Sequence, residues 1–212
     1  MKKTTALLSV SAAALLAAGG YVAFHPGVAQ ATPTYVQETT TPQAGIYSVD
    51  TAHTSIVFKI DHMGLTNVWG RFNEFSGDIN LTPEVTGSSI NVTVQAASVD
   101  TAVPARDNHL RNADFFEVEK FPTLTFVSEQ VRREGDGFFA DGKLTIREIT
   151  KPVTVEFRFF GPVNDPRGAT RIGVIVEPFT IDRRDFGIDY GQGTIGNDVT
   201  INIGLEGILK KE

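Results

Sequence analysis

The dominant pattern along the chain is an alternation of apolar and polar residues with a period of two, which is typical of half-buried antiparallel strands. Ile56, Phe58, Ile60 and His62, for example, share one face, whereas Lys59 lies on the other. The same alternation predicts eight strands, at residues 55–62, 75–81, 90–96, 124–126, 138–146, 153–159, 172–176 and 199–205. An all-β domain follows, in which the apolar faces of the strands meet.

One segment, residues 104–120, lacks this alternation. Leu110, Ala113 and Phe116 lie there at helical spacing, so the sequence predicts a short helical segment. The connections between strands contain Gly, Asp, Asn and Pro, most clearly at 134–137 and 164–168, and these residues favour turns.

Eight such strands can form a sandwich or a closed barrel, and closure has the advantage of removing exposed strand edges. The interior of an eight-stranded barrel either fills with side chains or holds one small ligand. Gly77, Ala96 and Ala140 lie on faces otherwise made of large apolar residues. These small residues favour a closed barrel with an internal cavity, although a sandwich core would also accommodate them.

The first 31 residues differ from the rest of the chain. Their only charged side chains are Lys2 and Lys3, an apolar run covers 6–24, and Ala29 and Ala31 occupy the positions that a signal peptidase recognises. We therefore expect a cleaved signal peptide at 1–31 and export to the periplasm. The alternative is an uncleaved membrane anchor. A flexible Thr- and Pro-rich tether is expected at 32–45, followed by the barrel domain at 46–209.

Composition narrows the classes of function. The net charge is −6 for the whole chain and becomes −8 after cleavage, which disfavours binding to nucleic acids and to anionic membranes. Transfer of a lipid would therefore need a transient contact with a membrane or a membrane protein. The absence of cysteine excludes disulfides, thiolate metal sites, iron–sulfur clusters and a cysteine nucleophile.

Several ordered segments resemble the YceI-like family of lipocalin-like periplasmic proteins. They are DTAHTSIVFKIDHMGLTNVWGRFNEFSGDI (50–79), RDNHLRNADFFEVEKFPTLTF (106–126), KLTIREITKPVTV (143–155), RRDFGI (183–188) and IGNDVTINIGLE (195–206). The resemblance implies an eight-stranded up-and-down barrel that encloses a polyisoprenoid chain, such as an isoprenoid quinone or a prenyl phosphate. It also implies carriage, storage or sequestration of that lipid without chemistry on it, and no other cofactor.

An isoprenoid tail needs an apolar tunnel, because each buried CH₂-sized group contributes roughly 0.8 kcal/mol. The chain contains 15 Phe, and branched isoprene units pack well against aromatic rings. An ordinary core position is the alternative for any one of these side chains. The apolar candidates for ligand binding are Phe58, Ile60, Trp69, Phe72, Phe75, Phe116, Phe126, Phe157 and Phe159.

Polar candidates for the head group are Arg106, His109 and His62, which would meet if the helical segment covers one mouth of the barrel. Arg106 is the best donor to a phosphate or carbonyl oxygen. The competing interpretation is that Arg106 and Asp107 pair with the charged run 183–185 and attach the helix to the barrel.

Motifs for catalysis and for metal binding are missing from the sequence. His53, His62 and His109 match no compact metal-ligand spacing, and there is no G-x-S-x-G motif, so we expect neither a metal site nor catalytic residues. Two other hypotheses remain open at this point. One is a hydrolase or isomerase that uses His62, His109 and Asp107 on a lipid-like substrate. The other is a barrel filled by its own side chains that binds another protein through its surface.

Overall fold

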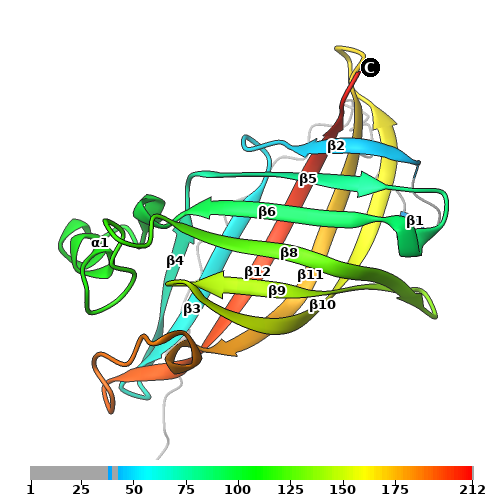
Figure 1. Ribbon diagram of the computed structural model, residues 1–212. Coiled ribbons are helices and arrows are strands. Elements are labelled where there is room, and N and C mark those ends of the chain that lie inside the picture. Colours follow the sequence, from blue (N-terminus) through cyan, green and yellow to red (C-terminus); the bar gives the residue numbers. More distant parts are fainter. Residues whose placement is uncertain (1–37, 40–42, 212) are drawn as a thin grey trace, which may run out of the picture. The chain divides into compact units, whose positions relative to one another are not determined.

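A computed structural model describes residues 38–39 and 43–211, and these residues are mostly β-structure (Figure 1). The strands are β1 (Glu38–Thr39), β2 (Gly45–Val49), β3 (Ser55–His62), β4 (Thr66–Phe72), β5 (Phe75–Leu81), β6 (Ser89–Gln95), β7 (Val99–Asp100), β8 (Thr123–Glu134), β9 (Gly137–Ile146), β10 (Ile149–Asn164), β11 (Thr170–Asp182) and β12 (Ile195–Leu209). The helical elements in this range are α1 (Pro104–Arg111) and three short 3₁₀ turns, η1 (Val85–Gly87), η2 (Ala96–Ser98) and η3 (Arg183–Phe186).

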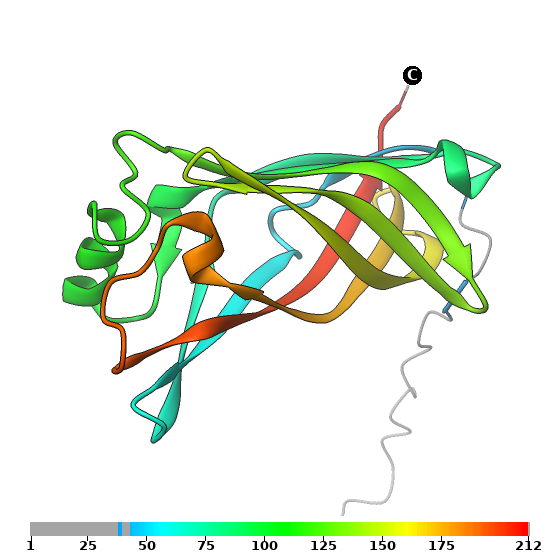
Figure 2. The ribbon, with the colours of Figure 1, turned by 60° about the horizontal axis from the view of Figure 1, so that its bottom comes forward.

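The strands close into a barrel of eight antiparallel strands, as the alternation predicted (Figures 1 and 2). β5 pairs with β6, and the pairing continues in chain order through β8, β9, β10, β11 and β12. β12 then returns to β2 and β3. β2 with β3 forms the first strand of the barrel and β4 with β5 the second, so the topology is up-and-down.

Among the stretches that the sequence analysis left unassigned, β2 and β4 contribute to the barrel strands. In β4, Gly70 and Phe72 are buried while Trp69 and Arg71 are exposed, which is the alternation expected of a half-buried strand. The aromatic ring of Phe58 lies over Gly70 on the paired strand, where an added Cβ would come within 2.3 Å of it. Glycine interrupts the apolar face of β4 in the sequence and leaves room for this ring.

The helix is shorter than the segment 104–120 that the spacing indicated. It begins at Pro104, which suits the first helical position because its missing N–H needs no partner there. It ends at Arg111, because Asn112 has extended backbone with a ψ of 176°. The following turns are held by local hydrogen bonds, such as Phe116 N to Leu110 O at 3.0 Å.

Buried side chains form two clusters along the barrel axis. One fills the end opposite α1, where the rings of Phe138, Phe157 and Phe159 pack at 5.0 to 5.9 Å and Tyr47 is fully buried. Burial also raises the pKa of the Tyr47 phenol above its ordinary value. The other cluster lies beside α1 and includes Phe72. The first cluster closes one end of the barrel.

The predicted signal peptide at 1–31 lies outside the described residues. Of the expected tether at 32–45, Glu38 and Thr39 form β1 and pair with Phe160 and Phe159 of β10. Within the part of the chain that the structure describes, helices are too short or too polar to cross a membrane.

Candidate functional site: an apolar cavity in the barrel

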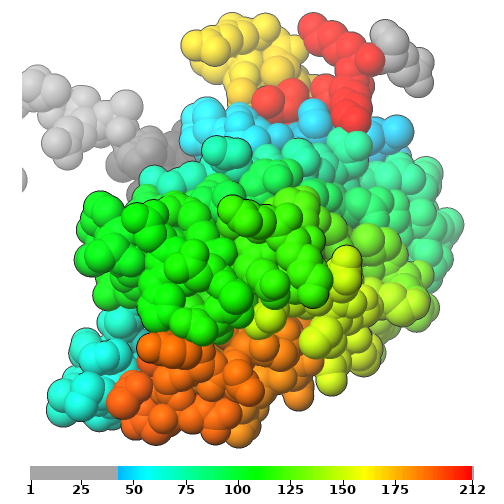
Figure 3. Space-filling model, turned by 60° about the vertical axis from the view of Figure 1, so that its left-hand side comes forward, coloured from blue at the N-terminus to red at the C-terminus, as the bar shows by residue number. Residues whose placement is uncertain are grey.

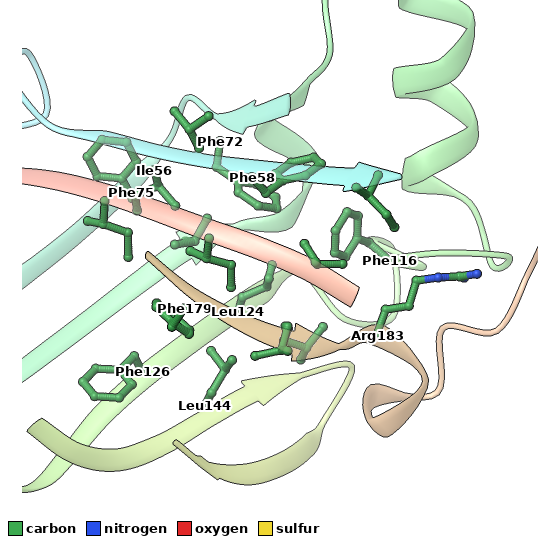
Figure 4. A pocket seen from close by; sticks show the side chains of 18 of the residues that line it. Ile56, Phe58, Phe72, Phe75, Phe116, Leu124, Phe126, Leu144, Phe179 and Arg183 are labelled. Carbon is green, nitrogen blue, oxygen red and sulfur yellow. The ribbon is translucent and has the colours of Figure 1, made fainter. Parts of the chain in front are cut away.

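A cavity of about 880 Å³ lies inside the barrel, between the closed end and the α1 segment. This volume falls within the range of roughly 300–1,000 Å³ that is usual for small-molecule sites. Figure 4 shows Phe58, Phe72 and Phe75 on one side of the cavity and Leu124 and Phe126 on another, with side chains directed into it. The wall consists mainly of aliphatic and aromatic side chains, so the cavity suits a hydrocarbon.

Inward-facing side chains in the middle of the barrel keep part of their surface accessible. Val92, Phe126, Leu144, Val176 and Ile203 all line the cavity, and each is only half-buried. Interior side chains of a filled core would be fully buried at these positions. The barrel is therefore not filled by its own side chains, which disfavours the hypothesis of a solid structural module.

The two ends of the cavity differ. Phe157, 1% exposed, lines the floor and packs against Phe138 and Phe159. At the other end the lining includes Asp61, His62 and other exposed residues, so the cavity reaches the surface there. We call this end the mouth; the β3–β4 hairpin, the α1 segment and the segment from η3 to β12 surround it.

Arg106 lines the mouth from α1. Its Nε donates to Thr101 Oγ1 at 2.7 Å and its Nη2 to Thr101 O at 3.0 Å, whereas Asp107 accepts bonds from Thr101 N and Oγ1 at 2.8 and 2.5 Å. Arg106 and Asp107 thus fix the turn before α1 and do not pair with 183–185. Among the described residues, no carboxylate is recorded as an ion-pair partner of Arg106, and the side chain lines the cavity.

Arg183 is a second arginine at the mouth, and only 4% of its surface is exposed. Its guanidinium donates to three backbone carbonyls, those of Gly196 at 2.8 Å, Ile188 at 3.0 Å and Ile195 at 3.3 Å. Burial lowers the pKa of Arg183 below its ordinary value. Figure 4 shows its side chain at the same end of the cavity as Phe116. The carbonyls hold this cation in place and fix the segment that forms one wall of the mouth.

An aromatic cluster joins two walls of the mouth. His109 on α1 lies 5.1 Å from the ring of Phe115 and 4.9 Å from the ring of Tyr190, and Phe115 and Tyr190 are 5.4 Å apart. His109 Nε2 also contacts Asp114 Oδ2 at 2.8 Å. These contacts connect the α1 segment to the segment after η3.

Most of the residues predicted to bind a ligand lie around this one cavity. The members that line it are Phe58, Ile60, His62, Phe72, Phe75, Arg106, His109, Phe116, Phe126 and Phe157. Trp69 and Phe159 do not line it. Trp69 is 54% exposed on the outer face, and Phe159 packs at the closed end beyond Phe157. Ligand contact by any of these residues stays a prediction.

The small residues that pointed to a cavity do not form its wall. Ala140 is fully buried at the closed end, and Ala96 is buried in the cluster beside α1. Gly77 lets two strands approach, because a Cβ there would lie 2.4 Å from Asn91 O. The wall consists instead of larger apolar side chains from strands all around the barrel.

Sequence reasoning missed Arg183 and Tyr190 as parts of the mouth. Arg183 was considered only as an ion-pair partner, yet it stands in RRDFGI, one of the segments that carried the family resemblance. Tyr190 follows in a Gly-rich run without alternation. Only the three-dimensional arrangement brings this run beside α1.

The residues of the alternative catalytic hypothesis are not arranged as an acid–base group. The carboxylate of Asp107 is held by Thr101, and His109 uses its Nε2 on Asp114. His62 is an exposed residue at the tip of β3. His109 and Asp107, the pair that the hypothesis needs, therefore have different partners.

A charged network spans the break between β2 and β3. Asp50, His53 and Glu206 offer three possible metal-ligand atoms within 4.8 Å of one another. The Arg171 guanidinium, however, lies 2.5 Å from Asp50 Oδ2, 3.4 Å from Glu206 Oε2 and 2.8 Å from Asp165 Oδ2. The same guanidinium pairs with all three carboxylates, so the group forms a structural ion-pair network.

This network predicts loss of stability in acid. The hydrogen bonds of Asp50 with Arg171 and His53 lower its pKa from 3.8 to about 2, and its side chain is 11% exposed. A lowered pKa in the folded state contributes stability above pH 3.8 that is lost as the pH falls towards 2. We expect Asp50→Asn to cost about 1 to 2 kcal/mol at pH 7 and to flatten the decline between these pH values, measured by urea unfolding. Asp136→Asn, at a 97% exposed side chain, is the control, and identical pH profiles for both variants would contradict the assignment.

Fold and site together define a class, the β-barrels with an apolar internal cavity open at one end. Within that class the chain belongs to the YceI-like domain family, whose model matches residues 47–207. This membership confirms the resemblance noted in the sequence.

Sequence matches to related proteins extend over most of the chain. It is 38% identical over 171 residues to a UPF0312 protein of Shewanella oneidensis and 37% identical over 171 residues to Protein YceI of Salmonella arizonae. Each match covers 79% of this chain and 89% of the relative. Among solved structures, a polyisoprenoid-binding domain from Saccharophagus degradans, implicated in plant cell wall breakdown, matches with a TM-score of 0.62 and 17% identity, over 79% of this chain and 100% of that domain. That likeness shows a shared fold.

Proposed function

We propose that this protein binds a polyisoprenoid lipid, an isoprenoid quinone or a prenyl phosphate, inside its barrel and carries, stores or sequesters it. The observation that carries the proposal is the apolar cavity of about 880 Å³, closed at one end by buried aromatic rings and polar at the other. Each CH₂-sized group of a tail gains roughly 0.8 kcal/mol on leaving water, of which a part appears as affinity. Family membership and the fold shared with a polyisoprenoid-binding domain support the choice of ligand.

In this proposal the protein binds the lipid and does not convert it chemically. The histidines and the carboxylate of the alternative hydrolase or isomerase are engaged in separate contacts, or exposed at the rim of the cavity. Turnover of a candidate lipid that disappears in His62→Ala or His109→Ala would favour the enzyme.

The proposal places the protein in the periplasm, after removal of residues 1–31. N-terminal sequencing of the exported protein tests this, and a chain that still begins at Met1 in the membrane fraction would support the uncleaved anchor instead.

Native mass spectrometry of the full chain, purified from an extract that contains membranes, tests lipid binding. We expect a retained mass that matches a quinone or a prenyl lipid. An empty barrel that takes up no added isoprenoid would overturn the proposal.

The head group is predicted to lie at the mouth, next to Arg106 and His62. Because a hydrogen bond from a charged donor contributes about 1.5–3 kcal/mol, Arg106→Met should weaken retention of a phosphate- or carbonyl-bearing lipid roughly tenfold to a hundredfold. His62→Ala should shift the preference among head groups, with a smaller effect than that of Arg106→Met. Lipid extraction followed by mass spectrometry measures both effects.

Arg184→Met is the matched control, since this arginine pairs with Asp182 at 2.5 Å and does not line the cavity. Unchanged retention and unchanged head-group preference in both mouth variants would rule out the polar end as a head-group site.

A further inference from the structure

Large apolar side chains on the surface gather around the mouth. Of those exposed in the described residues, Met63 and Leu65 form the tip of the β3–β4 hairpin, Trp69 follows in β4, and Val103 and Tyr190 line the cavity itself. Ile149, at the start of β10, lies beside the end of η3. Its Cδ1 is 3.3 Å from the position that a Cβ on Gly187 would occupy. We define the apolar rim as Met63, Leu65, Trp69, Val103, Ile149 and Tyr190, with exposures of 39–79%.

Figure 3 shows the α1 segment in green, the segment from η3 to β12 in orange and the β3–β4 hairpin in cyan gathered on this end of the molecule. The other large exposed apolar residues lie singly on strands elsewhere, at Ile46, Val127, Val163 and Ile175. Single exposed residues are common, whereas a group around one opening marks an interaction surface.

The hairpin tip is unusual for a turn. Leu65 is 79% exposed and Met63 is 56% exposed, with Met63 in the left-handed region at a φ of 58°. Hairpin turns normally carry Gly, Asn or Asp at such positions. The barrel does not bury these two side chains, so their chemistry suits a surface outside the molecule.

The kinds of residue in the rim point to a lipid bilayer. Trp and Tyr favour the head-group level of a membrane, while Met and Leu favour the hydrocarbon beneath it. Lys59 Nζ lies 5.9 Å over the Trp69 ring, which places a cation next to the rim.

Charge at the mouth is complementary to lipid phosphate. The chain carries a net charge of −6, yet Arg106 and Arg183 line the mouth and, in the described structure, donate to Thr101 and to backbone carbonyls instead of carboxylates. Among the described lining residues Asp61 carries the acidic side chain. Arg106 is the lining cation that can meet a lipid phosphate, because the Arg183 guanidinium is 4% exposed and bonded to backbone carbonyls.

We propose that the apolar rim docks the mouth of the barrel onto a phospholipid bilayer. Met63 and Leu65 enter the hydrocarbon, while Trp69 and Tyr190 lie at the head-group level. The inference rests on the proposed function, because a lipid tail in the cavity must come from a membrane. Docking at the mouth lets the tail move from bilayer to cavity without exposing each CH₂ group to water.

The single tryptophan of the chain, Trp69, reports on docking directly. The probe is vesicles of phosphatidylcholine and phosphatidylethanolamine, with and without bromine on the acyl chains, added to the full-length protein. We expect a blue shift of the Trp69 emission and quenching by the brominated lipid. Leu65→Asp and Met63→Asp should each weaken this binding roughly tenfold or more.

Matched controls are Val127→Asp and Ile175→Asp, at exposed apolar residues on the barrel wall, which should bind vesicles like the wild type. Vesicle binding without quenching of Trp69 would overturn the proposal, because another segment would then hold the membrane. An equal loss of vesicle binding in rim and wall variants, or no vesicle binding by the wild type, would also overturn the docking proposal. The apolar rim would then be assigned to a protein partner.

Native mass spectrometry of the same samples separates this inference from the proposed function. A retained lipid in a protein that does not bind vesicles overturns docking alone. Vesicle binding through the rim by a protein whose cavity stays empty and takes up no isoprenoid supports docking and overturns the proposed function.

Discussion

A double variant with tryptophan in place of Val92 and Val176 is expected to hold lipid about 50-fold more weakly than the wild type. Both valines line the cavity and are half-buried, so the larger rings extend into empty space and not into packed neighbours. If the rings displace about three CH₂-sized groups of the tail, the loss of binding free energy is roughly 2.4 kcal/mol. This loss corresponds to an affinity about 50-fold weaker. Titration of the lipid-free protein with a polyisoprenoid measures the effect.

The double variant Val127→Trp and Ile175→Trp is its control. These residues are immediate sequence neighbours of inward-facing positions on β8 and β11, but they are 47% and 41% exposed on the outside of the barrel. Binding should be unchanged in this control. If both double variants bind like the wild type, the lipid does not occupy the cavity.

The second large effect concerns stability. Phe138→Ala is expected to lower the free energy of unfolding by about 3–5 kcal/mol, because Phe138 is 1% exposed and packs against Phe157 and Phe159. Phe126→Ala, which removes a half-buried ring from the cavity wall, should cost roughly half as much. Urea unfolding of the lipid-free proteins measures both values, since bound lipid would add its own stabilisation.

Comparable losses in the two variants would contradict this account. Phe126 would then be packed on all sides, and the middle of the barrel would be as full as its closed end. The comparison therefore tests the division of the interior into a filled end and an empty cavity.

The period-two pattern was enough to predict the barrel strands that alternate without interruption, such as β3 and β6. It failed at β4, where Gly70 replaces an apolar residue because the ring of Phe58 occupies the space of its side chain. Placing Trp69 in the same alternation as Gly70 and Phe72 assigns it to the outer face, where the structure has it.

Alternation predicts which side chains point inward but not which of them border empty space. Phe157 and Phe159 face inward two residues apart on β10, yet Phe157 lines the cavity and Phe159 lies beyond its floor. Both rings contact Phe138 of β9, so the point where the filled end stops depends on packing between strands and not on alternation along β10. The mouth was equally hard to foresee, because closure of the barrel brings Tyr190 to His109 of α1 and places Arg183 in the lining of the same cavity.

The most direct test of the central claim is a crystal structure of the protein purified from membrane-containing extract without added lipid. The account predicts continuous tubular electron density that runs from the mouth near Arg106 to the floor at Phe157, with the polar end of the molecule at the mouth. A cavity filled by rearranged side chains or by ordered water, in protein that also takes up no isoprenoid, would contradict it.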